Sequence, residues 1–192
     1  MRPIVLTLAA ISLITSCGQT APSLFGTFSS SEFGFELTVP EDLERNGWGI
    51  IHARDATVSH TFTPPDTSSW QPIAVVVPPG SLFPTLSPIF VDVFNVKDPS
   101  ISAIALADKK AERVADRVLS RQTITAGSLD LAQVVHGSGD DVNYETFAVG
   151  NGFGYALLAQ GAPDTSRTAT SFFVDSIADG RIVSSLRLMP PQ

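Results

Sequence analysis

The chain has 192 residues, of which 43% are hydrophobic and 16% are charged, with 14 glycines and 14 prolines. This composition excludes a disordered or fibrous chain and is typical of one globular domain with many turns. The formal net charge of -7 opposes binding to phosphate backbones, and no stretch combines basic with aromatic residues, so we expect no nucleic-acid partner.

The N-terminus predicts an export signal. A charged start at Arg2 is followed by an apolar run from Ile4 to Ile14 and then by small residues. A transmembrane helix needs about 20 apolar residues, and this run is too short. We therefore expect residues 1–16 to be a signal peptide that is cleaved.

The signal ends in Ile14, Thr15, Ser16 and Cys17, which resembles the bacterial lipobox, an aliphatic residue and two small residues before a cysteine. The resemblance implies that a signal peptidase recognises Ile14, Thr15 and Ser16 and cuts before Cys17. It also implies that the Cys17 thiol carries a diacylglycerol and that the new amino group is acylated. Two or three acyl chains hold a protein on a membrane almost permanently. The alternative is an ordinary secretory signal with a chance cysteine.

We expect residues 17–31 to form the lipidated cysteine and a tether, and residues 32–192 to form a single domain. The polar tether spans at most roughly 45 Å. Leu24, Phe25 and Phe28 interrupt it, which leaves open that its second half packs on the domain. An aspartate directly after the cysteine tends to retain Gram-negative lipoproteins at the inner membrane, and Gly18 occupies that position here, which favours an outer-membrane or outward-facing location. The expected location is therefore the cell membrane or the outer membrane, facing the periplasm or the exterior, with a protein partner in the envelope left open.

Apolar runs predict strands throughout the domain. The first extends from Phe33 to Val39 and stops at Pro40. Further strands are expected over 48–53, 58–63, 73–77, 89–96, from Thr123 onward, 129–135, 142–149, 153–160 and 181–188. Asn151-Gly152 between two apolar runs predicts a tight hairpin turn.

Two helices interrupt the strands. The first is predicted from Asp98, as its cap, with Pro99 at the first position and apolar residues at helical spacing as far as Val118. The second is predicted over residues 165–178. Because hairpins dominate, the predicted fold class is α+β, an antiparallel β-sheet with helices packed on it.

The opening stretch over 32–40 (EFGFELTVP) and the closing stretch over 182–188 (IVSSLRL) resemble the Mog1/PsbP/DcrB-like group of α/β sandwiches. Many bacterial members of that group are lipoproteins. The resemblance implies a PsbP-like sandwich and a non-catalytic accessory protein of the cell envelope.

No catalytic motif is recognisable in the sequence, and we expect no catalytic residue, no metal and no cofactor. His52 and His60, on neighbouring predicted strands, and Asp55 leave open a metal site or an acid–base pair. The favoured interpretation is that they are ordinary strand residues. Asp140 and Asp141 are interpreted as a solvated turn rather than a calcium site.

The first predicted helix has a basic stripe beside an acidic one. The basic residues are Lys109, Arg113, Arg117 and Arg121, and the acidic ones are Asp108, Glu112 and Asp116. We interpret them as a salt-bridged solvent face, with docking to anionic lipid or a partner as the alternative. The predicted function is a lipid-anchored, non-catalytic binding or accessory module. An envelope hydrolase and a carrier of a small apolar ligand between sheet and helices are the alternatives.

Overall fold

The computed structural model describes residues 23–56, 60–67, 69–78, 88–138, 141–161 and 181–190. The predicted signal peptide, Cys17 and the predicted helix over 165–178 lie outside these residues. Within the described residues, no helix is both long enough and apolar enough to cross a membrane.

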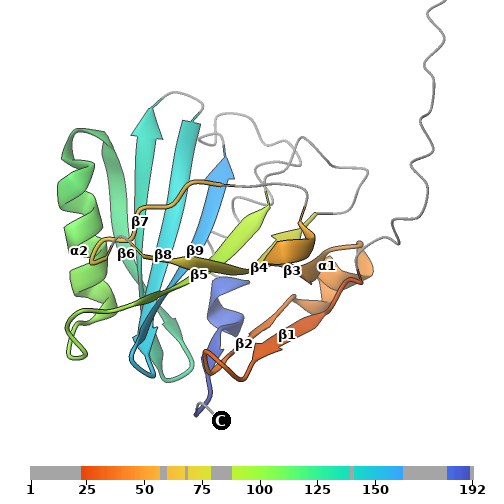
Figure 1. Ribbon diagram of the computed structural model, residues 1–192. Coiled ribbons are helices and arrows are strands. Elements are labelled where there is room, and N and C mark those ends of the chain that lie inside the picture. The colour runs from red at the N-terminus through yellow and green to blue at the C-terminus, as the bar shows by residue number, and fades with distance from the viewer. Residues whose placement is uncertain are drawn as a thin grey trace, which may run out of the picture.

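The larger of two antiparallel sheets has seven strands (Figure 1), in the order β3-β4-β5-β9-β8-β7-β6. They are β3 (Gly49–His52), β4 (Gln71–Val77), β5 (Ile89–Asn95), β6 (Val118–Ala126), β7 (Leu129–Ser138), β8 (Asp141–Gly150) and β9 (Phe153–Gly161). Every pair of neighbours is antiparallel. Alternating and continuous apolar runs predicted most of these strands, since a strand with one or two buried faces requires them.

The smaller sheet contains strands from both ends of the described chain. Its order is β1 (Thr27–Ser30), β2 (Phe35–Thr38) and β10 (Arg187–Leu188). Before β1, the backbone of Phe25 exchanges hydrogen bonds of 2.9 and 2.8 Å with Ile50 of β3. Residues 24–30 are therefore part of the fold. The second half of the predicted tether packs on the domain, which is the alternative that the sequence left open.

Each face of the larger sheet has its own apolar core. On one face, the smaller sheet covers a cluster that includes Phe35, Leu37 and Tyr155, all completely buried. On the other face, α2 (Ala103–Arg113) covers a cluster that includes Leu106 and Phe147. Figure 1 shows α2 alongside β6, β7 and β8, and the small sheet on the opposite side. The predicted α+β fold class is confirmed.

The turn between β8 and β9 is a tight hairpin turn, as predicted. Asn151 has φ of 54° and Gly152 has φ of 81°, which are the positive values that a type I′ turn requires. The side-chain nitrogen of Asn151 also donates to the carbonyl oxygens of Gly34 (3.1 Å) and Met189 (2.8 Å). The turn therefore ties the larger sheet to the smaller one.

The first predicted helix is shorter at both ends than the sequence indicated. Ser102, not Asp98, is its cap, and its Oγ accepts a hydrogen bond of 3.1 Å from the nitrogen of Ala105. Asp98 instead closes a preceding turn, accepting from the backbone nitrogen of Ser100 at 2.9 Å. The helix ends at Arg113 and a short 3-10 turn leads into β6 at residue 118, so the predicted extension to Val118 was wrong.

Two predicted strands were also wrong or too long. Residues 60–63 of the strand expected over 58–63 have no strand pairing, and Pro64 and Pro65 follow them directly. The strand expected over 181–188 contains a 3-10 turn at Val183–Ser185, and only Arg187–Leu188 pairs in a sheet. The short helix α1 (Glu41–Arg45) was not predicted.

Candidate functional site

Residues 60–67, which we call the strap, lie across the helix-covered side of the larger sheet. Phe62 is its apolar anchor, because its ring is 4% exposed and belongs to the same cluster as Leu106 of α2 and Phe94 of β5. The strap therefore extends the cover that α2 provides on this face.

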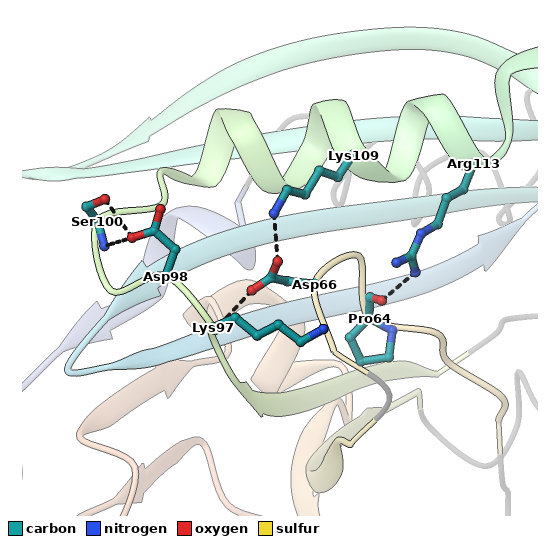
Figure 2. A network of polar contacts seen from close by, with 7 residues as sticks. All are labelled: Pro64, Asp66, Lys97, Asp98, Ser100, Lys109 and Arg113. Atoms are coloured by element: carbon teal, nitrogen blue, oxygen red, sulfur yellow. Dashed lines mark hydrogen bonds and ion pairs between the residues drawn. The ribbon is translucent and has the colours of Figure 1, made fainter.

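Polar contacts hold the C-terminal half of the strap, at Pro64 and Asp66 (Figure 2). Asp66 accepts hydrogen bonds of 2.7 Å from the backbone nitrogen of Lys97 and 2.6 Å from Nζ of Lys109, and Pro64 O accepts one of 2.7 Å from Arg113. The hydrogen bond from Lys109, followed by that from Lys97, lowers the pKa of the Asp66 carboxyl. Lys109 and Arg113 thus hold a segment of their own chain.

The predicted basic stripe does not exist as one surface. Arg117 lies beyond the end of α2, and Arg121 lies on β6, where it pairs with Asp108 at 3.0 Å. The stripe was wrong because it required the helix to continue past Arg113. The Arg121–Asp108 pair does agree with a salt-bridged face.

The first residue of the strap, His60, contacts a buried carboxylate. Asp92 of β5 is completely buried, and its Oδ2 lies 2.6 Å from Nε2 of His60. Burial raises the pKa of Asp92, and the hydrogen bond with His60 opposes this rise. An ionised carboxylate can only accept, so in the ionised form of Asp92 the donor is Nε2 of His60. Within the described residues, Oδ1 of Asp92 has no hydrogen-bond partner.

A cavity of about 370 Å³ lies beside this histidine. Its walls include His60, Trp70 and Phe90, together with Pro72 and Val75 of β4. The ring of His60 stacks on Phe90 with 3.9 Å between centroids and lies 5.1 Å from Trp70. The pairing of β4 with β5 is irregular next to Pro72, where a proline within a sheet is tolerated.

A second buried network lies under α2. Oε1 of Glu145 accepts from Nζ of Lys110 at 2.8 Å and lies 2.9 Å from Nε2 of His136. The three side chains are each about 10% exposed or less. Lys110 also lies 5.9 Å from the centre of the Phe62 ring. Within the described part of the chain, Oε2 of Glu145 has no partner.

The other two residues of the predicted acid–base group, His52 and Asp55, do not pair with His60. His52 ends β3, and its ring packs edge-on against Phe28 at 5.0 Å and Phe25 at 5.8 Å. Asp55 pairs only loosely with its exposed neighbour Arg54, at 3.9 Å. The expectation that His52 and His60 lie on neighbouring strands was wrong, because His60 lies on the strap.

Metal ligands do not gather in the described residues, where no three His, Cys, Asp or Glu side chains could hold an ion. Asp140 lies outside them. Nor does any Ser, Thr or Cys side chain there hydrogen bond to a histidine. The His60–Asp92 pair can orient a ring and hold a proton, but the described chain offers it no nucleophile.

Sequence reasoning did not single out Asp92, Lys110, His136 or Glu145. A signal was present in Asp92, since it is the one charged residue in the predicted strand over 89–96. A charged side chain that shares a buried face with Phe90 and Phe94 needs a partner there. The partner itself is 32 residues away in sequence, so no local pattern indicates it.

The fold is that of the PsbP-like α+β sandwiches. A solved structure that shares it is the solution structure of cyanobacterial PsbP (CyanoP) from Synechocystis sp. PCC 6803. The two chains have a TM-score of 0.52 and 14% sequence identity, over 91% of this chain and 98% of that one. No model of a known protein family matches the chain, and a search of curated protein sequences also found no match. The PsbP-like part of the expected resemblance is confirmed at the level of the fold.

Proposed function

We propose that the protein is a lipid-anchored accessory module of the cell envelope, which binds a partner or ligand without catalysing a reaction. The observation that carries this proposal is the pairing of the buried acid–base groups. His60 is paired with Asp92, and both His136 and Lys110 contact Glu145, while no described serine, threonine or cysteine side chain is hydrogen-bonded to either histidine. Pairing of this kind stabilises and orients side chains, and within the described residues neither histidine has a serine, threonine or cysteine beside it to activate.

Anchoring is proposed through Cys17. The supporting observations are the lipobox-like motif over 14–17 and the short apolar leader before it. The PsbP-like fold adds support, because the resemblance to the Mog1/PsbP/DcrB-like group implies an accessory protein of the envelope.

The anchor is tested by the intact mass of the mature protein from cells and by membrane fractionation. We expect a chain that starts at Cys17 and carries a diacylglycerol and an acyl group. Cys17→Ser should leave an unprocessed precursor or a protein released from membranes, while Ser23→Ala should behave like the parent. A parent chain with an unmodified thiol at position 17 would contradict the anchor.

The absence of catalysis is tested separately, with p-nitrophenyl acetate as a sensitive probe of histidine-dependent hydrolysis. The parent and His60→Gln should hydrolyse it at the same low rate, with His52→Gln as the matched histidine control. A parent rate that falls at least tenfold in His60→Gln alone would favour the hydrolase alternative.

A further inference from the structure

The cavity beside His60 has the dimensions and walls of a small-molecule site. Its volume of about 370 Å³ lies at the lower end of the range for ligand pockets, roughly 300 to 1,000 Å³. Three rings line it, and two of them, His60 and Phe90, are stacked with 21° between their planes. Aromatic walls favour an aromatic ligand, because rings attract one another in offset and edge-on arrangements.

The position of each wall is set by the rest of the fold. Phe90 is on β5, and Trp70 directly precedes β4 and also contacts Phe62 of the strap at 5.8 Å. His60 is held from behind by Asp92 at 2.6 Å. A preorganised wall costs little ordering on binding, which is what a ligand site requires.

Charge near the cavity selects against anions. No lysine or arginine is among the described residues that line it. Asp92, completely buried, lies directly behind His60, and the chain as a whole has a formal charge of -7. His60 is a polar group of the wall besides the indole N–H of Trp70, and its Nδ1 is bonded to no described residue. A neutral imidazole whose Nε2 donates to a carboxylate can accept at Nδ1.

We propose that this cavity binds a small planar aromatic molecule that is neutral or positively charged and donates an N–H hydrogen bond to His60. This inference gives the proposed binding module a ligand, and it rests on that module not being an enzyme. It does not depend on the lipid anchor, so each can fail without the other.

The two tryptophans allow a direct test in the full-length protein. Trp70 lines the cavity, whereas Trp48 belongs to the core on the opposite face of the sheet. Titrating indole into the ¹⁵N-labelled protein should shift the indole N–H resonance of Trp70 in a saturable way, with a dissociation constant below about 1 mM. The Trp48 resonance should not move.

Matched probes separate the contributions of charge and hydrogen bonding. Tryptamine should bind at least fivefold tighter than indole-3-acetate, which has the same ring with a negative charge, because of the carboxylate behind His60. Asp92→Asn should remove this preference. Indole should bind several-fold tighter than naphthalene, which has no N–H donor.

Variants of the walls complete the test. Phe90→Ala should weaken indole binding at least tenfold, and His52→Gln, which changes a histidine outside the cavity, should leave it unchanged. If Phe90→Ala does not fold, the parent protein still decides the question. The proposal is overturned if no probe gives a saturable shift at Trp70, if Trp48 shifts equally, or if indole-3-acetate binds as tightly as tryptamine. Turnover of a bound probe would instead contradict the proposed function.

Discussion

Nζ of Lys110 lies 2.8 Å from Oε1 of Glu145, in the interior between α2 and the larger sheet. Lysine and glutamate are among the residues least often buried, and they are tolerated inside a protein when each has the other as a partner. His136 adds a second contact to the same oxygen. The pair fixes α2 over β8 by a contact that apolar packing alone does not specify.

Replacing Lys110 should therefore lower the free energy of unfolding more than replacing its exposed neighbour Lys109. Lys110→Met leaves the buried carboxylate of Glu145 with only His136, and we expect the free energy of unfolding to fall by about 3 kcal/mol. Lys109→Met is the matched control, since the Lys109 side chain is 44% exposed and its loss should cost less. Urea denaturation measures both. Equal losses in the two variants would contradict the assigned role of Lys110.

The contact between the strap and α2 should depend on pH through Asp66. Its pKa lies below the ordinary value of 3.8, so ionised Asp66 contributes stability above pH 3.8 that is lost as pH falls through its lower folded pKa. Asp66→Asn should therefore unfold at a lower urea concentration than the parent at about pH 7, and the difference should shrink as pH falls below 3.8. A difference that stays constant over this range would show that the charge of Asp66 is not what holds the strap.

The N-terminal segment before residue 32 should be needed for stability. Phe28 is 5% exposed and packs against Phe35, with 6.0 Å between ring centroids. Phe28→Ala should lower the free energy of unfolding by about 3 kcal/mol, because it leaves a cavity in the core. Phe25→Ala is the control within the same segment and should cost less, since Phe25 is 39% exposed. Thermal denaturation that is unchanged in Phe28→Ala would mean that the segment is a free tether.

Substitutions at Gly152 measure the energetic cost of its backbone conformation without a change in side-chain packing. Its φ is 81°, and a Cβ at this position would meet no atom within 4 Å. Gly152→Ala should therefore lower the free energy of unfolding by about 1 kcal/mol through strain alone. Gly152→Asn should lower it less, because asparagine tolerates positive φ better than alanine. Chemical denaturation of the two variants gives the order, and the reverse order would contradict a purely conformational cost.

Local signals in the sequence were sufficient for much of the sheet. The turn at Asn151 and Gly152 was predicted because its residues are selected by backbone dihedral angles, which depend on nothing distant. The strand over 89–96 was predicted for a similar reason, since its apolar run is contiguous. The anchor at Cys17 remains a prediction.

The errors arose where tertiary contacts overrode a local pattern. Val114 and Val118 continue the helical spacing of α2, yet Val118 already pairs with His136 in the sheet. Residues 60–63 have the composition of a strand, but they are part of the strap and form no strand pairing. The sequence singled out His60 but not its partner Asp92, because the two meet only after the strap crosses the sheet.

For a chain anchored at Cys17, as proposed, the backbone pairing of Phe25 with Ile50 would also limit how far the domain can move from a lipid bilayer. The greatest separation is then set by the peptide units between Cys17 and Phe25. Eight peptide units reach at most about 30 Å when fully extended, compared with roughly 45 Å for a linker that continues to residue 31. The domain would then work close to the headgroups, and its partners would have to reach it within that narrow layer.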